Sequence, residues 1–251
     1  MLRTTLIAAL LAPFPLTTLA QTEPWSVGIG VGGGQAIYHD QDNKPMPMPL
    51  LRYRGEHVFV EGDNVGVTVF NTAKLSGALL LRSEMQEFNP ADAKQLAFAR
   101  LDKRRASPLA GMQLSYRPGQ FDSLAFTVYG DISQHHRSVI PAIGWQHRFA
   151  ASGPDTQYFS SAELRFHGKK YNRYYYGISA AESVRSGLAA HAPAASEQFE
   201  YALGVNHRIS PSWSLTAIAS VRNIGRELDD SPMVARRRVA SLLVGASYRL
   251  D

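Results

Sequence analysis

The sequence predicts an all-β protein, a closed antiparallel transmembrane β-barrel of about twelve strands. Residues 239–251 alternate between apolar and polar side chains over about twice the length of an ordinary soluble strand. A tilted strand of that length can cross a bilayer. Similar segments recur along the chain, and short turns and long loops alternate between them. These observations together indicate a membrane barrel.

The first twenty residues are typical of a cleavable signal peptide. Arg3 precedes an uncharged run over Thr4–Leu19, and small residues occupy the last position and the third from last before the cut after Ala20. The brevity of the run and its two prolines argue against a membrane helix. We therefore expect a signal peptide at 1–20 and an outer-membrane barrel at 21–251.

The composition excludes several classes of protein. The chain has no cysteine, which excludes disulfides and thiolate metal sites. Its net charge is +5, and its lysines and arginines are scattered rather than grouped with aromatics, so we expect no nucleic-acid partner. Mean hydropathy is −0.19, which still fits a barrel because only every second strand residue faces lipid.

Twelve segments place apolar and polar side chains on opposite faces. Leu79–Leu81 leaves one segment ambiguous, and Leu243 breaks the alternation of the last. Ten or fourteen strands also fit, because the second to fifth segments are short and irregular. The predicted strands are 25–33, 48–54, 57–61, 65–70, 73–82, 107–117, 122–132, 137–149, 156–166, 198–209, 212–222 and 239–251.

Connection lengths predict the topology. Connections after even-numbered strands are short, as in Gly55-Glu56 and Ser210-Pro211. Connections after the first, fifth, ninth and eleventh strands are long, and those after the third and seventh fall on the same side. Outer-membrane barrels have short periplasmic turns, long extracellular loops and an even number of strands. We therefore expect both termini in the periplasm.

Aromatic residues lie near the ends of the predicted strands on the apolar face. Interfacial girdles of a membrane barrel lie there, whereas a soluble β-domain would use the same residues as core. The signal peptide favours the membrane barrel. These residues are Trp25, Tyr116, Trp145, Phe149, Phe166, Phe199, Trp213 and Tyr248.

Four segments carry a family resemblance. In Tyr171–Leu188 an aromatic-rich stretch runs into Gly-Ile-Ser, then an acidic residue and Gly-Leu. Asp230–Val234 contains Ser-Pro-Met-Val, and the chain opens with Trp25–Gly34 and Tyr38, followed by Leu51–Gly55. In this order, these segments resemble the MipA/OmpV family (MltA-interacting protein) of outer-membrane β-barrel proteins over essentially the whole mature chain.

The resemblance implies a monomeric barrel in the cell outer membrane. One family member is described as a scaffold linking a lytic murein transglycosylase to a peptidoglycan synthase, and others as porin-like or surface proteins. The family has no established catalytic residues to carry over. Asp251 departs from the aromatic residue that usually ends such barrels, so we expect Tyr248 and Leu250 to provide the assembly signal less efficiently.

Charged residues gather on the predicted lumen face, where they must be solvated or paired. They fit either an ion-pair plug or a weakly anion-selective pore, and the narrow lumen of twelve strands favours the plug. The predicted lumen-facing charges are Arg117, Arg148, Glu163, Arg165, Glu200, Arg208, Arg222 and Arg249, with Arg52, Arg54 and Asp131 nearby.

The sequence predicts no catalytic, cofactor or metal site. Gly28–Gly34 lies within a strand, unlike a dinucleotide-binding loop. His135 and His136 are adjacent, and adjacent residues on a strand point to opposite faces, so the two cannot readily share a ligand. Asp229 and Asp230 have no histidine partner placed by the sequence. We expect no enzyme and no cofactor.

Basic residues are frequent in the long loops, at the height of lipopolysaccharide phosphates, which lysine and arginine bind well. Ordinary solvated loop charge fits equally. We also expect a helical turn at Ala180–Ser186. The basic residues are Lys94, Arg100, Lys103, Arg104, Arg105, Lys169, Lys170, Arg173, Arg236, Arg237 and Arg238.

Three functions remain open. The first is a non-enzymatic outer-membrane scaffold for peptidoglycan-synthesising and -hydrolysing enzymes. The alternatives are a narrow porin-like channel for small solutes and a surface protein acting through its extracellular loops. The expected surroundings are outer-membrane lipid and lipopolysaccharide, around a monomer. Tiny periplasmic turns leave little surface for the partner of a scaffold.

Overall fold

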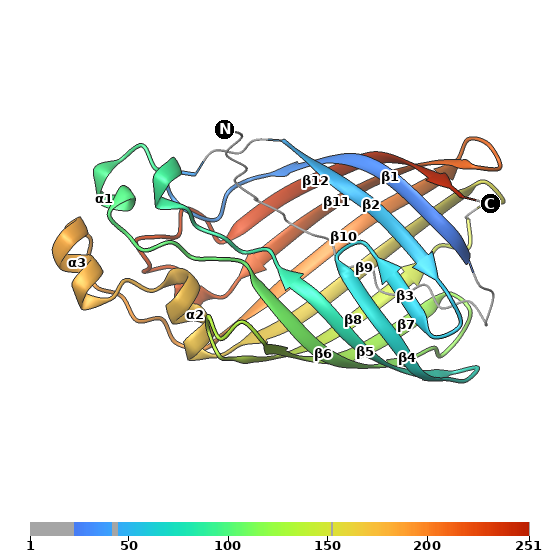
Figure 1. Cartoon of the computed structure of the whole chain (residues 1–251), viewed down its shortest axis with the longest axis horizontal. Helices are drawn as coiled ribbons and strands as arrows, with labels where there is room; N and C mark the ends of the chain where they lie inside the picture. Colours follow the sequence, from blue (N-terminus) through green and yellow to red (C-terminus); the bar gives the residue numbers. More distant parts are fainter. Residues whose placement is uncertain (1–22, 42–44, 152, 251) are drawn as a thin grey trace.

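Twelve antiparallel strands close into one barrel in the computed structural model, which describes residues 23–41, 45–151 and 153–250 (Figure 1). Each strand pairs with its neighbours in sequence, and β1 pairs with β12 to close the ring. The predicted fold class and strand count are confirmed. The predicted signal peptide and Asp251 lie outside the described residues. The strands are β1 (Glu23–Gly34), β2 (Met46–Arg54), β3 (Val58–Glu61), β4 (Asn64–Asn71), β5 (Leu75–Glu84), β6 (Ser107–Tyr116), β7 (Asp122–Asp131), β8 (Val139–Arg148), β9 (Thr156–His167), β10 (Ser196–Arg208), β11 (Trp213–Ile224) and β12 (Arg238–Arg249).

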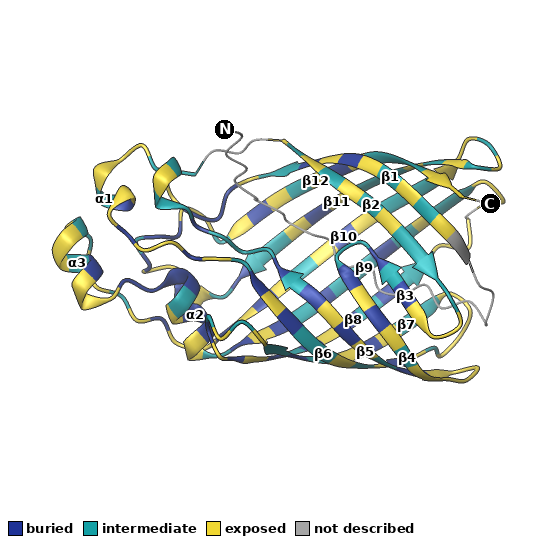
Figure 2. Cartoon of the chain, in the orientation of Figure 1, coloured by how far each residue is buried: buried dark blue, intermediate teal, exposed yellow. Residues whose placement is uncertain are grey.

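Exposed and buried residues alternate along the strands, as the banding in Figure 2 shows. The exposed apolar side chains face outward, where a membrane barrel meets lipid. Leu243 instead points inward, and its Cδ1 lies 3.0 Å from where a Cβ on Gly30 would stand. The break in the alternation of β12 is therefore a residue that fills the space over glycines of β1.

Aromatic rings cover glycines elsewhere in the lumen. Phe159 on β9 lies opposite Gly204 on β10, and a Cβ on that glycine would stand 2.1 Å from the ring. Tyr129 lies over Gly111 in the same way, at 2.7 Å. Large rings fit into this narrow barrel because their cross-strand neighbours have no side chain.

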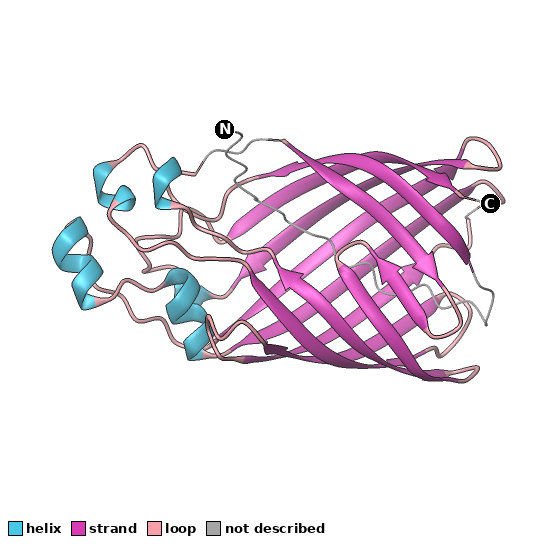
Figure 3. Cartoon of the chain, viewed as in Figure 1, coloured by secondary structure: helices cyan, strands magenta, loops and turns pink. Residues whose placement is uncertain are grey.

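The two ends of the barrel differ. Five short connections, such as 55–57 and 209–212, lie at one end, here called the turn end. The long connections and all the described helices lie at the other, the loop end (Figure 3). None of the described helices is long and apolar enough to cross a bilayer. The helices are η1 (Pro90–Asp92), α1 (Leu96–Ala99), α2 (Lys169–Tyr176), α3 (Ala180–Ser186) and η2 (Arg226–Leu228).

Two loop-end segments test predictions made from the sequence, one for a helical turn and one for the start of a strand. The predicted helical turn at Ala180–Ser186 is confirmed as α3. The strand predicted from Arg137 begins at Val139 instead, because Arg137 belongs to the connection 132–138 and has a left-handed backbone, with φ of 51°. An Asp131 carboxylate oxygen accepts the Arg137 N–H at 2.8 Å, which holds Arg137 in this connection rather than in β8.

Among the described residues, the barrel wall leaves the first part of β2 unpaired on one side. β3 has only four residues, so the first part of β2 pairs with β1 alone. The Leu51 carbonyl accepts the Gly62 N–H at 2.9 Å, so main-chain groups of Pro49 and Pro47, two and four residues earlier, point to the same side. Proline has no N–H, so this edge carries no unsatisfied donor at either position.

Candidate functional site

An ion pair crosses the lumen toward its loop end. Arg165 on β9 pairs with Glu163 on its own strand, and its guanidinium lies 3.3 Å from a carboxylate oxygen of Glu84 on β5. Strands β6, β7 and β8 separate β5 from β9 in the wall. The contact between Arg165 and Glu84 therefore spans the lumen rather than following the sheet.

Further buried charges complete this layer. Arg82 on β5 lies 3.2 Å from the Asp63 carboxylate and 5.8 Å from the centre of the Tyr129 ring. Arg222 on β11 donates to Glu200 on β10 at 2.9 Å. Removing one member of such a pair leaves an uncompensated buried charge. We call this set the charge belt; it consists of Asp63, Arg82, Glu84, Glu163, Arg165, Glu200 and Arg222.

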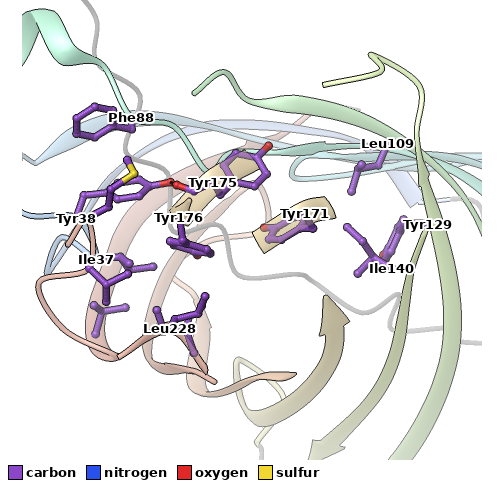
Figure 4. Close-up of a cluster of buried hydrophobic side chains, with 14 of the residues drawn as sticks. Ile37, Tyr38, Phe88, Leu109, Tyr129, Ile140, Tyr171, Tyr175, Tyr176 and Leu228 are labelled. Atoms are coloured by element: carbon purple, nitrogen blue, oxygen red, sulfur yellow. Dashed lines mark hydrogen bonds between the residues drawn. The ribbon is translucent and has the colours of Figure 1, made fainter. Parts of the chain in front are cut away.

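A cluster of buried side chains from the loops closes the loop end above the charge belt (Figure 4). Helix α2 contributes Tyr171, Tyr175 and Tyr176, all essentially inaccessible to solvent. The Tyr171 ring stacks on His167 at the end of β9, with 3.9 Å between ring centres. We call this cluster the cap; its main members are Ile37, Tyr38, Phe88, Phe98, Leu101, Tyr171, Tyr175, Tyr176, Ile178, Leu228, Met233 and Val234.

Hydrogen bonds attach α2 to distant loops. The Tyr175 hydroxyl donates to the Ser107 hydroxyl at 2.9 Å, and its carbonyl accepts the Tyr38 hydroxyl at 3.1 Å. The Tyr176 carbonyl accepts the Ser231 hydroxyl at 2.6 Å. Two other connections and the start of β6 thus hold α2 in the mouth of the barrel.

Beyond the cap, α1 and α3 form a small tip around Glu182. Its carboxylate accepts from the Arg104 guanidinium at 2.6 Å, from the Asp102 N–H at 3.0 Å and from the Ser179 N–H at 2.9 Å. Burial raises the pKa of the Glu182 carboxyl, but these hydrogen bonds and the Arg104 charge outweigh it. The pKa therefore lies below its ordinary value, and the carboxylate stays ionised.

At the turn end, four arginines each donate a backbone N–H to a carbonyl in or beside a neighbouring turn. The accepting carbonyls are Lys74 for Arg117, Phe121 for Arg148, Asp155 for Arg208 and Ser212 for Arg249, at 2.7–2.8 Å. Arg54 occupies the corresponding end of β2. Each lies an even number of residues from the inward-facing residues of its strand, so all five stand around the lumen mouth. We call Arg54, Arg117, Arg148, Arg208 and Arg249 the arginine ring.

The eight charges predicted for the lumen fall into two groups. Glu163, Arg165, Glu200 and Arg222 are brought together in the charge belt. Arg117, Arg148, Arg208 and Arg249 form most of the arginine ring, and Arg208 is half-exposed and paired with Asp155 at 2.7 Å.

Sequence reasoning missed Asp63, Arg82 and Glu84 of the charge belt. Arg82 and Glu84 lie on β5, the ambiguous strand, and Asp63 lies in the turn between β3 and β4. Leu79 and Leu81 are in fact exposed and Leu80 is buried, which places residues 82 and 84 inside with Leu80. If Leu79 and Leu81 are assigned to the outward face and Leu80 to the inward face, the alternation places Arg82 and Glu84 in the lumen.

The histidine and aspartate pairs considered from the sequence have structural partners. His135 and His136 lie in the connection 132–138 rather than on a strand; His135 contacts the Ser107 hydroxyl at 3.2 Å. Asp229 pairs with Arg237. Within the described residues, no three His, Cys, Asp or Glu side chains are grouped so as to hold a metal ion.

Comparison with known proteins gives a consistent result. A family model described as MltA-interacting protein MipA matches residues 27–250. The MltA-interacting protein of Escherichia coli (strain K12) is 25% identical over 225 residues, covering 90% of both chains. The outer membrane protein OmpV of Vibrio cholerae is 23% identical over 216 residues, covering 84% of this chain and 80% of its own. Among solved structures, the NanC porin covers 89% of this chain and 100% of its own, with 10% identity and a TM-score of 0.45.

Proposed function

Because this chain belongs to the MipA family and is an outer-membrane protein, we propose that it is a non-enzymatic closed barrel that holds a peptidoglycan enzyme at the periplasmic face. The Escherichia coli relative is named for an interaction with MltA. The proposed partners are a lytic transglycosylase and a peptidoglycan synthase. By the rule for outer-membrane barrels, the turn end faces the periplasm and therefore these enzymes.

The arginine ring is the observation that carries this proposal. Of the six strands that run toward the turn end, β2, β8, β10 and β12 finish in arginine, Arg117 directly follows β6, and β4 ends in Asn71. Arg148 and Arg249 form no ion pair with a described residue. A collar of positive charge attracts an acidic surface and orients it on approach. The short turns leave the collar accessible, so a partner can bind without long periplasmic loops.

The filled lumen supports a scaffold over a channel. The charge belt spans the lumen at one level, and the cap fills the loop end above it. A solute would have to displace both layers, and separating the buried pairs of the belt is costly. A porin-like function would therefore require a rearrangement of two packed regions.

A second candidate function rests on the tip. Leu96 on α1 and Val184 on α3 are 65% and 88% exposed, on helices that Glu182 and Arg185 hold together. Apolar side chains displayed on a firm support are suited to contact with another surface protein. This role would use the loop end and leave the arginine ring free.

Binding measurements separate the two candidates. The barrel, in detergent micelles, would be immobilised and titrated with a purified lytic transglycosylase and with a peptidoglycan synthase. We expect Arg148→Gln/Arg249→Gln to weaken binding about ten-fold and to reduce its dependence on salt. The matched control, Arg236→Gln/Arg238→Gln, removes two exposed charges at the loop end and should bind normally. Equal affinity of the ring variant and the unaltered protein would refute the scaffold. The tip lies at the loop end, so Val184→Ser should leave the binding of these periplasmic enzymes unchanged.

A further inference from the structure

Helix α2 has a second face that the cap does not use. Its buried face carries the cap tyrosines, whereas Lys169, Lys170 and Arg173 are exposed. The helix begins two residues after His167, the last residue of β9. These three charges therefore lie just above the point where the strand leaves the membrane.

Two arginines from other loops join them. The Arg105 N–H donates to the Tyr174 hydroxyl of α2 at 2.9 Å. His135 stacks on the same Tyr174 ring, with 5.7 Å between centres, and Arg137 follows two residues later. Both arginines are exposed. We call Arg105, Arg137, Lys169, Lys170 and Arg173 the basic patch; it lies over the loop ends of β6 to β9.

The charges of the basic patch are not compensated within the described structure. None of the five forms an ion pair with a described residue. Other loop-end cations do: Lys103 pairs with Glu87 at 2.9 Å, and Arg104 with Glu182. Asp131 is the acidic residue nearest to Arg137 in sequence, and its side chain is fully buried.

Its carboxylate is already occupied by the connection 132–138. One oxygen accepts from Ser133, and the other accepts the N–H groups of His136 and Arg137, each at 2.8 Å. Asp131 therefore holds the backbone that displays Arg137 and leaves the exposed charges of the patch without an acidic partner.

The outward face directly below the patch is apolar. Ile132 follows β7, Val139 begins β8 and Phe166 is the last residue but one of β9; all three are exposed. A cationic cluster bordering a lipid-facing surface is placed at the height of lipid headgroups. Lysine and arginine form charge-assisted hydrogen bonds with phosphate oxygens, and several together hold a phosphorylated headgroup.

We propose that the basic patch binds the phosphate groups of the phosphorylated glycolipid in the outer leaflet. The acyl chains of that lipid would lie along the apolar face below, and its phosphates would contact α2, Arg105 and Arg137. The site is at the opposite end of the barrel from the arginine ring, so it does not depend on the proposed scaffold role.

The test uses the whole protein in detergent micelles, stripped of lipid, and titrated with lipid A that carries both phosphates. We expect Lys169→Gln/Lys170→Gln/Arg173→Gln to weaken binding at least ten-fold. The matched control Arg236→Gln/Arg238→Gln, at the same end but beside β12, should change it less than two-fold. Lys169→Arg/Lys170→Arg keeps the charge and should bind like the unaltered protein, which separates loss of charge from loss of structure.

Two further probes identify the source of the phosphate. Dephosphorylated lipid A should bind at least ten-fold more weakly than the phosphorylated form, and inorganic phosphate at equal concentration should not compete. Equal binding of both lipids, or unchanged affinity in the triple variant, would overturn the proposal. Competition by inorganic phosphate would overturn it too, because the site would then recognise the free ion.

Discussion

Arg165 is the residue on which the charge belt depends most. Its guanidinium contacts Glu163 and Glu84, and all three side chains are at least nine-tenths buried. Without this cation, two carboxylates would remain in a region with little access to water. A buried charge that loses its partner costs more than the pair contributed.

Replacing Arg165 should therefore destabilise the barrel strongly. We expect Arg165→Met to lower the free energy of unfolding by about 3–5 kcal/mol, measured by urea titration in lipid vesicles. The control Arg208→Met breaks an exposed pair with Asp155 and should cost about 1 kcal/mol or less. Similar losses in both variants would contradict the assignment of Arg165 to a buried belt.

A glycine beneath an aromatic ring offers a second test at this scale. A Cβ added at Gly204 would stand 2.1 Å from Phe159, whereas the nearest atom at Gly130 is the Ala110 carbonyl at 3.9 Å. We expect Gly204→Ala to cost about 1–3 kcal/mol through overpacking and Gly130→Ala to cost much less. Adding Phe159→Leu to Gly204→Ala should recover part of the loss in the same titration; no recovery would mean that the ring is not the obstacle.

Among the elements, the strands were the most predictable. β12 shows its outward face in six alternating apolar residues, and its neighbours follow the same rule, because lipid on one side imposes a period of two. The ends of the strands were less certain. Arg137 reads as part of a strand, but its place in a turn depends on hydrogen bonds to Asp131.

The cap could not be predicted in the same way. The segment around Tyr171 was noticed for its aromatic residues, but no local pattern marks it as a helix in the mouth of the barrel. Its contacts are with Tyr38, Ser107 and Ser231, which are all far away in sequence. The arginines of the arginine ring were predicted only as charges on the lumen face of their strands. A shift of one or two residues along a strand decides whether such a side chain lies inside the lumen or at its rim.

The tip should respond to acid through Glu182. Its pKa is lower in the folded than in the unfolded chain, so its contribution to stability is complete above the ordinary glutamate range and is lost as the pH falls through the lowered pKa. We expect hydrogen exchange of the α3 amides to be slow near neutral pH and, relative to β-strand amides, faster at about pH 3. Glu182→Gln should exchange fast at both pH values; a slow and pH-independent α3 in that variant would contradict this role.

For the whole molecule, two stacked layers close one passage. We expect no stepwise conductance from the unaltered protein in planar bilayers, because the charge belt and the cap lie in series. Replacing residues 168–195 with a short glycine-serine linker should not open it alone, and neither should Glu84→Ser/Arg165→Ser. The combination should conduct. Stepwise currents from the unaltered protein would show that the layers part readily and would favour the channel.

The prolines of the β2 edge affect how the barrel behaves among its neighbours. A bare strand edge is a template onto which another chain can add a strand. Here, over Pro47 and Pro49, an incoming strand would find carbonyls to accept its hydrogen bonds and no N–H groups to return them. The gap left by the short β3 therefore offers a strand from a neighbouring barrel an incomplete set of hydrogen-bonding groups.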